Sequence, residues 1–330
     1  MPAIRKRLKD AKQVIITTHL SPDGDAIGSS LGLHHFLAQE GIPSKVIVPN
    51  AFPKFLQWLK GSDEICVFEE DKERAQQLFE SADVVFCLDY NETKRTGYMQ
   101  EDIDKSAACK VLIDHHIGNP TWPDINLSVV GASSTCELVY DFAEAYSNGE
   151  LPLNQDLAYA LYTGLLTDTG NFQFSATTPK VHMQAARLIE AGVQPDLVHN
   201  HINNSFDELR LQFFGFCVSE RMKILKGRGI AYMALSREDI LQFNIQTGGT
   251  EGLVNEPMKI ANIDVSILLK EDEGKVKLSF RSKRDIDISV FAREFFQGGG
   301  HRNAAGGVSF ASLAETEEEL VKRLKDFNIS

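Results

Sequence analysis

The sequence contains few cysteines and no long apolar run. Its five cysteines are widely spaced and form no C-x-x-C pair, which argues against a disulfide framework and against a zinc site built on cysteines. No window approaches the ~18 apolar residues that a membrane span requires, and the basic start at Ile4 to Arg7 is not followed by one. We therefore expect a soluble cytoplasmic protein that does not enter a membrane.

Positive charge is also scarce. The 330 residues include 34 Lys and Arg against 46 Asp and Glu, which gives a formal net charge of -12 at pH 7. A protein that wraps long duplex nucleic acid needs a basic surface to displace counterions from the phosphates, so we do not expect that partner. A small anionic substrate remains compatible with the charge, because metal ions held by carboxylates reverse the sign of the field inside one site.

Length and composition predict two domains. The chain exceeds a typical single core, and 43% of its residues are hydrophobic. Short apolar runs alternate with helical patterns in the first part, which predicts an α/β domain with a parallel sheet, and a smaller α/β unit follows a mostly helical stretch. We predict an N-terminal domain over residues 1–204, a helical linker over 205–225 and a C-terminal domain over 226–330. We expect the active site in the cleft between the domains.

Acidic and histidine residues follow three of the predicted strands. They are His19, Asp23 and Asp25 after Gln13 to Thr18, Asp89 after Val84 to Leu88, and Asp114, His115 and His116 after Lys110 to Ile113. Ligands of open parallel sheets bind beyond the carboxyl ends of the strands, so we expect these side chains to meet. Each group alone could be a polar turn, and Asp25 could cap a helix that starts at Ala26. Three such strand ends together favour a divalent metal, which carboxylates and imidazoles bind well.

One more acidic residue, Asp168, ends an apolar helix within Gly164 to Gly170. Alone it is an ordinary turn residue, but it completes a set of candidate metal ligands. This set is His19, Asp23, Asp25, Asp89, His115 and Asp168. Its two imidazoles and four carboxylates suffice for two metal ions that share one bridging carboxylate. Two ions roughly 3.5–4 Å apart stabilise the attacking and leaving oxygens of a displacement at phosphorus, so the sequence predicts phosphoester hydrolysis.

A glycine-rich segment near the C-terminus supplies candidate substrate-binding residues. They are Gly298, Gly299, Gly300, His301 and Asn303, together with Arg281 and Ser282 at the end of a predicted strand. Glycines let the backbone approach a ligand closely, and an arginine offers a planar fork to an anion. Without the metal site, a flexible loop beside a solvated arginine would explain these residues equally well.

These motifs resemble those of the DHH phosphoesterases, in particular the branch of nanoRNases and pAp phosphatases, over almost the whole chain. Four motifs of the N-terminal domain are matched by His19 to Ser29, Asp89, Asp114 to His116, and Gly164 to Gly170, and Gly298 to Gly306 resembles the mark of the C-terminal DHH-associated domain. The resemblance implies a manganese-dependent enzyme with two metal ions. Its substrates would be short oligoribonucleotides, cleaved to mononucleotides, and 3'-phosphoadenosine 5'-phosphate (pAp), cleaved to AMP and phosphate.

The resemblance also implies a role for each residue. One metal ion would be held by His19, Asp23 and Asp89, and the other by Asp25, Asp89, His115 and Asp168. His116 would lie beside the scissile phosphate, and Asp114 would orient a ligating imidazole. Hydroxyl groups near the metals would come from Ser133, Ser134 and Thr135. Arg281 and His301 would bind the far phosphate or nucleotide end of the substrate from the second domain.

Shared motifs define the chemistry better than the substrate. Within the fold, the alternatives are a cyclic-dinucleotide phosphodiesterase acting on c-di-AMP or pApA, a RecJ-like single-strand exonuclease and a family II inorganic pyrophosphatase. A non-catalytic nucleotide-binding protein would have a broken ligand set, and an RNA-binding module would show a basic stripe. This sequence has neither feature. It leaves open whether the chain forms a homodimer.

Overall fold

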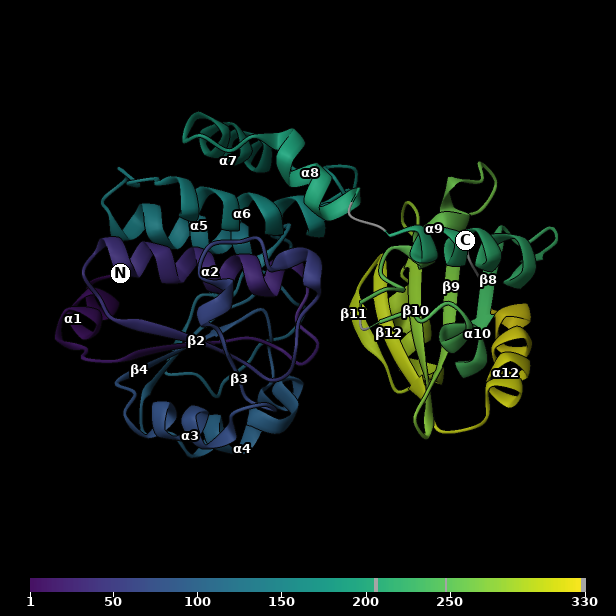
Figure 1. The fold of residues 1–330 in the computed structure, drawn as a ribbon, viewed down its shortest axis with the longest axis horizontal. Coiled ribbons are helices and arrows are strands. Elements are labelled where there is room, and N and C mark those ends of the chain that lie inside the picture. The colour runs from purple at the N-terminus through teal and green to yellow at the C-terminus, as the bar shows by residue number, and fades with distance from the viewer. Residues whose placement is uncertain (205–206, 247, 328–330) are drawn as a thin grey trace. The chain divides into compact units, whose positions relative to one another are not determined.

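The computed structural model describes residues 1–204, 207–246 and 248–327. The chain divides into two compact units, Met1–Ser205 and Phe206–Ser330, and each is described by itself (Figure 1). Residues 205 and 206, where the predicted linker begins, lie outside the described residues. Among the described helices, none combines the length and the apolarity that crossing a membrane requires.

The first unit is built on a six-stranded parallel sheet with the order β3-β2-β1-β4-β5-β6. Its strands are β1 (Val14–Thr17), β2 (Ser44–Val48), β3 (Cys66–Val67), β4 (Val84–Leu88), β5 (Cys109–Ile113) and β6 (Ile125–Asn126). The chain runs outward from β1 through β2 to β3 and then returns to β4 on the other side of β1. This reversal makes the carboxyl ends of β1 and β4 the switch point at which such sheets bind ligands. The predicted α/β fold class is confirmed.

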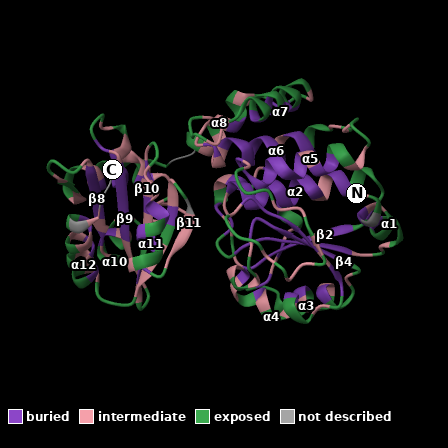
Figure 2. Ribbon diagram, turned by 180° about the vertical axis from the view of Figure 1, so that it is seen from behind, coloured by how far each residue is buried: buried purple, intermediate pink, exposed green. Residues whose placement is uncertain are grey.

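Helices cover both faces of this sheet (Figure 1). The helices of the unit are α1 (Pro2–Asp10), α2 (Gly24–Gln39), α3 (Lys72–Glu80), α4 (Gln100–Lys105), α5 (Thr135–Tyr146), α6 (Gln155–Asp168), α7 (Pro179–Glu190) and α8 (Pro195–Asn203). Val14 and Ile16 of β1 pack in the core formed with α2, α5 and α6, whereas Ile15 packs in the core formed with α3 and α4. Because strand side chains alternate between faces, a strand buried on both sides reads as a continuous apolar run. Figure 2 shows this burial along the central strands and α2.

A line of glycines lets α2 and α6 approach each other closely. Gly24, Gly28 and Gly32 are spaced by four residues, so they share one face of α2. A Cβ atom added to Gly28 would lie 2.6 Å from the carbonyl oxygen of Ala160 in α6, too close for any real side chain. The close approach sets the start of α2, with Asp25, beside the end of α6, with Asp168.

The second unit is a mixed six-stranded sheet with the order β11-β12-β10-β9-β8-β7. Its elements are α9 (Glu208–Phe216), a π-helical turn (Cys217–Arg221), β7 (Met222–Leu225), β8 (Ile230–Leu235), α10 (Arg237–Gln242), β9 (Val265–Asp272), β10 (Lys275–Ser282), α11 (Ile288–Phe295), β11 (Gly299–His301), β12 (Ala304–Ser309) and α12 (Leu313–Asp326). One core is formed with α11 and α12, and a second core is formed with α9. The described part of the predicted linker, residues 207–225, is therefore helical up to Arg221, contributes α9 to this second core, and ends in the edge strand β7.

The glycine-rich segment forms a β-hairpin in which β11 pairs with β12. The sequence did not indicate these strands, because glycine has little β-propensity and the segment shows no alternating apolar pattern. A Cβ atom on Gly298 would overlap the carbonyl oxygen of Gly306, and Gly300 has a φ of +137°, so these positions require glycine. The glycines serve the close packing of the hairpin backbone.

Candidate metal centre

The site is centred on Asp89, which follows β4 directly. Its φ of +67° turns the chain at the strand end, a conformation that aspartate tolerates better than most residues. Its N–H donates to the carbonyl of Ile113 at 3.1 Å, which ties the turn to the end of β5. The carboxylate is buried and lies between the residues that follow β1 and β5.

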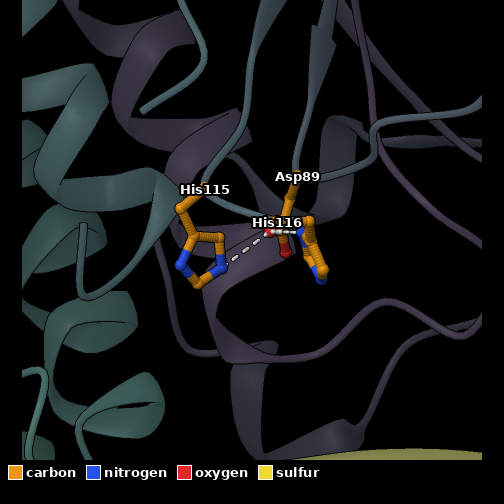
Figure 3. Close-up of side chains that lie close together, drawn as sticks. All are labelled: Asp89, His115 and His116. Atoms are coloured by element: carbon orange, nitrogen blue, oxygen red, sulfur yellow. Dashed lines mark ion pairs between the residues drawn. The ribbon is translucent and has the colours of Figure 1, made fainter. Parts of the chain in front are cut away.

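The two oxygens of Asp89 face different imidazoles. Oδ2 lies 3.3 Å from Nε2 of His19, and Oδ1 lies 3.3 Å from Nε2 of His115. Figure 3 shows His115 and His116 on either side of this carboxylate, and Nδ1 of His116 is 3.5 Å from Oδ1. A carboxylate with one oxygen directed to each of two imidazoles has the arrangement of a bridging metal ligand.

The start of α2 provides two more carboxylates. Asp23 is the N-cap of α2, because its Oδ1 accepts the N–H groups of Asp25 and Ala26 at 3.1 and 3.0 Å. The alternative in which Asp25 only caps the helix is therefore excluded, since Asp25 already lies in the first turn. Asp23 Oδ2 is 3.8 Å from His19 Nε2.

Asp25 and Asp168 lie on the other side of Asp89, around His115. His115 Nε2 is 3.3 Å from Asp168 Oδ2 and 3.8 Å from Asp25 Oδ2. The six predicted ligands thus fall into two groups whose ligand atoms lie within 4.8 Å of one another, one of His19, Asp23 and Asp89 and one of Asp25, His115 and Asp168. The division is the one that the resemblance implies, with Asp89 next to both groups.

The N-terminus of α5 holds two of these carboxylates. The backbone N–H groups of Thr135 and Cys136 donate to the two oxygens of Asp25 at 2.6 and 2.9 Å. The start of a helix stabilises a carboxylate, because the helix dipole is positive there and the first N–H groups have no partner within the helix. The hydroxyl of Thr135 donates to Asp89 Oδ1 at 3.0 Å. Thr135 therefore contacts both groups of candidate ligands, Asp25 through its backbone N–H and Asp89 through its hydroxyl.

The other two predicted hydroxyls serve local structure. Ser134 caps α5 by accepting the N–H of Glu137 at 3.0 Å. Ser133 donates through its N–H and its hydroxyl to the carboxylate of Glu137 at 2.7 and 2.9 Å. The hydrogen bonds of Ser133 and Ser134 thus order the loop, whereas Thr135 contacts the site itself.

Asp114 contacts His116 and not, as expected, a ligating imidazole. Its Oδ1 contacts Nδ1 of His116 at 2.8 Å, while Nδ1 of the candidate ligand His115 lies 3.2 Å from the carbonyl of Ala132. The reason is local, because residues two apart in an extended segment point to the same side. Asp114 is fully buried and orients the ring assigned to the phosphate.

Burial and mutual repulsion shift the pKa values of the acidic residues. Burial, followed by the negative charge of Asp89, raises the pKa of Asp25 to about 7. Burial and the charge of Asp25 raise the pKa of Asp168 well above its usual range. Burial also acts to raise the pKa of Asp89, but hydrogen bonds from His115 and His19 outweigh it and hold that pKa well below the usual range. Of these three carboxylates, Asp89 is therefore the one whose ionised form the site favours.

The imidazoles respond to the same charges. Burial lowers the pKa of His115 and of His19, yet Asp89 and the other carboxylates outweigh burial, so both pKa values are raised. For His116 burial prevails over Asp114, and its pKa is lowered.

The donor set fits a pair of divalent cations. Within residues 1–204, no lysine or arginine forms an ion pair with any of the four carboxylates assigned as ligands. Grouping buried carboxylates without a cation is costly, and the raised pKa of Asp25 reflects this cost. Imidazole and carboxylate ligands suit divalent ions such as Mn²⁺.

The predicted substrate residues of the second unit lie on β10 and in the glycine hairpin. Arg281 on β10 and His301 on β11 both pair with Ala304 of β12, from opposite sides, while the side chain of His301 lies outside the described part of the chain. The side-chain nitrogen Nδ2 of Asn303 lies within hydrogen-bonding distance of Ser282 Oγ and of the carbonyls of Arg284 and Ile286. Ser282 donates to the same carbonyl of Ile286 at 2.7 Å. Asn303 and Ser282 thus stabilise the loop after β10.

Two features of the site were missed by sequence reasoning. The glycine line of α2 was readable from its four-residue spacing. Arg95, which donates to the carbonyl of Asp89 at 3.4 Å, carries no signal of its own, because it lies in a short 3-10 segment among other polar residues.

Comparison with known proteins identifies the family of this chain. The N-terminal domain of the DHH family matches residues 13–165, and the DHHA1 domain matches residues 227–329. The chain belongs to the DHH family and is a phosphoesterase with a C-terminal DHHA1 domain.

Named relatives extend over nearly the full length. The probable bifunctional oligoribonuclease and PAP phosphatase NrnA of Streptococcus mutans is 29% identical, with 98% of this chain and 97% of that protein covered. NrnA of Bacillus subtilis is 28% identical, with 93% and 92% covered. An exopolyphosphatase-related protein from Bacteroides fragilis, known from its crystal structure, is 36% identical, with 98% and 95% covered and a TM-score of 0.92.

Proposed function

We propose that the protein is a cytoplasmic, manganese-dependent enzyme that hydrolyses short oligoribonucleotides to mononucleotides and pAp to AMP and phosphate. The observation that carries the proposal is the convergence of six predicted ligands around the shared carboxylate of Asp89. Two relatives that cover almost the whole chain are named bifunctional oligoribonuclease and PAP phosphatase, which supports the choice of substrates.

We assign one metal ion to His19, Asp23 and Asp89 and the other to Asp25, Asp89, His115 and Asp168. When bound, the two ions would stabilise negative charge on the phosphoryl oxygens. Manganese is supported by the RecJ structure from Thermus thermophilus, which was solved with Mn²⁺ and shares the fold at a TM-score of 0.54 and 12% identity.

The remaining site residues act on the substrate. His116, oriented by Asp114 at 2.8 Å, would contact the scissile phosphate and stabilise its developing charge. Arg281 would bind the far phosphate or nucleotide end, and the glycine hairpin with His301 would bind the same end.

A second candidate is a cyclic-dinucleotide phosphodiesterase. The cyclic-di-AMP phosphodiesterase GdpP of Bacillus subtilis is 25% identical over 98% of this chain, but the match covers only 49% of that protein. The two NrnA relatives are more similar to this chain, at 29% and 28% identity, and match it over 97% and 92% of their own length, so we favour the NrnA-like substrates.

The test is a substrate panel of pAp, RNA of two to five nucleotides, cyclic di-AMP, pyrophosphate and a single-stranded DNA, each with Mn²⁺ or with chelator. We expect Mn²⁺-dependent release of phosphate from pAp and of mononucleotides from short RNA. Preferred cleavage of cyclic di-AMP would select the second candidate. Cleavage of pyrophosphate or long single-stranded DNA in preference to pAp and short RNA would contradict both substrate assignments.

A further inference from the structure

Arg95 lies beside the metal centre, and the assignments above give it no role. It is half-buried within the short 3-10 segment Thr93–Met99, between β4 and α4. The segment is anchored by Met99, which is buried in the core with α3 and α4, and by the hydroxyl of the buried Thr96, which donates to the carbonyl of Thr93 at 2.7 Å. The backbone that carries Arg95 is therefore well fixed.

Arg95 contacts both loops of the switch point. Its guanidinium Nη1 donates to the carbonyl of Asp89 at 3.4 Å, after β4, and its own carbonyl accepts the N–H of Leu20 at 2.8 Å, after β1. The positive charge of Arg95 also acts on two nearby rings: it opposes the carboxylates that raise the pKa of His19, and it adds to burial, which lowers the pKa of His116. The guanidinium is thus held at the backbone of the candidate ligand Asp89, and its charge reaches the ring of His116, which is assigned to the phosphate.

The guanidinium has donors beyond those that the fold uses. Within residues 1–204, Arg95 forms no ion pair with a carboxylate, and its 3.4 Å contact to Asp89 involves only one nitrogen. The neighbouring Lys94, by contrast, is exposed and pairs with Glu92. Arginine presents five N–H donors in a planar fork that matches two oxygens of a phosphate.

We infer that Arg95 binds a non-bridging oxygen of the scissile phosphate, in the same compact unit as the metal ligands. The inference rests on the proposed phosphoesterase function and adds to it a residue that the metal motifs do not include. Charge that develops on the phosphoryl oxygens is stabilised by a donor that is already in position. Because the contact is with the scissile group, it serves every substrate of the enzyme equally.

The test compares Arg95→Gln and Arg95→Lys with Lys94→Gln, which removes the same charge one residue away at an exposed position. Each variant is assayed with Mn²⁺ on pAp and on bis(p-nitrophenyl) phosphate, a diester with a single phosphate. Binding of inorganic phosphate to the Mn²⁺-loaded protein and binding of Mn²⁺ alone are measured by calorimetry.

We expect Arg95→Gln to lose about 100-fold in kcat/KM on both substrates, the size reported for loss of one preorganised donor, and to bind phosphate at least tenfold more weakly. Arg95→Lys should retain part of both, and Lys94→Gln should match the wild type. If Arg95→Gln binds Mn²⁺ with unchanged affinity, its lower activity is due to lost phosphate binding and not to a structural effect on Asp89.

Three results would overturn the inference. The first is a phosphate affinity of Arg95→Gln equal to that of the wild type, and the second is a loss of kcat/KM confined to pAp, which would assign Arg95 to the second phosphate of pAp. The third is a weakening of Mn²⁺ binding that accounts for the whole loss of kcat/KM. Each leaves the proposed function intact if the wild type cleaves its substrates. A wild type that cleaves no phosphoester in the presence of Mn²⁺ would instead refute the proposed function.

Discussion

The hydroxyl of Thr135 should control how tightly the site binds metal. It is buried and donates to Asp89 Oδ1 at 3.0 Å, the carboxylate next to both ligand groups. Thr135→Val keeps the shape of the side chain, and the backbone N–H that donates to Asp25 remains. A hydrogen bond to a charged group contributes about 1.5–3 kcal/mol, which corresponds to a loss of about 10- to 100-fold in Mn²⁺ affinity.

Isothermal titration with Mn²⁺ measures this effect directly. Thr135→Ser, which restores a hydroxyl, should recover most of the affinity. Thr163→Val is the matched control, because Thr163 is buried in α6 and donates only to the carbonyl of Tyr159 in its own helix, at 2.8 Å. If Thr135→Val bound Mn²⁺ as tightly as Thr163→Val does, the hydroxyl would not position Asp89 and the reasoning would fail.

Four further predictions follow from the same geometry. Asp89→Asn, which keeps the shape and tolerates a positive φ, should abolish tight Mn²⁺ binding and turnover while the circular dichroism spectrum stays unchanged; retained activity with Mn²⁺ would contradict the shared-ligand role. Gly28→Ala should lower the free energy of unfolding in urea by about 1–3 kcal/mol, because its Cβ would meet the backbone of α6, and an equal or higher stability would refute the close approach. Arg281→Ala should raise KM for pAp more than it lowers kcat in steady-state kinetics, whereas a pure loss of kcat would speak against substrate binding. In the folded, metal-free protein Asp25 keeps its proton up to about pH 7, whereas in the unfolded chain it loses the proton near 3.8, so the stability of the metal-free protein should fall as pH rises between these values. Because Mn²⁺ replaces that proton, the increase in melting temperature that Mn²⁺ causes should be larger at about pH 7.5 than at about pH 5.5. An increase that is the same at both pH values would contradict this prediction.

The parts of the site that sequence reasoning predicted are those that depend on strand ends. His19, Asp89 and His115 each follow an apolar run, and in a parallel sheet such runs end at one edge. The strand order that brings β1 and β4 together could not be derived from the runs, because it depends on where the chain crosses back. The resemblance of the motifs implied how the ligands are grouped, and the structure supplied the strand order.

Contacts made by short side chains and by the backbone were harder to predict. The pairing of Asp114 with His116 depends on the chain staying extended after β5, so that side chains two residues apart point to the same side, and the sequence does not show whether it stays extended there. The strands β11 and β12 carry glycines in place of an alternating apolar pattern, so no periodicity indicated them. Asn303 and Ser282 stay predicted substrate contacts, and their hydrogen bonds also stabilise the loop after β10, a use that no local pattern reveals.

The most direct test of the central claim is a crystal of the protein grown with Mn²⁺ and measured at the manganese absorption edge. We predict two anomalous peaks roughly 3.5–4 Å apart on either side of the Asp89 carboxylate, one beside His19 and Asp23 and the other beside His115 and Asp168. A single peak, or peaks that do not contact Asp89, would contradict the shared metal centre on which the proposed chemistry depends.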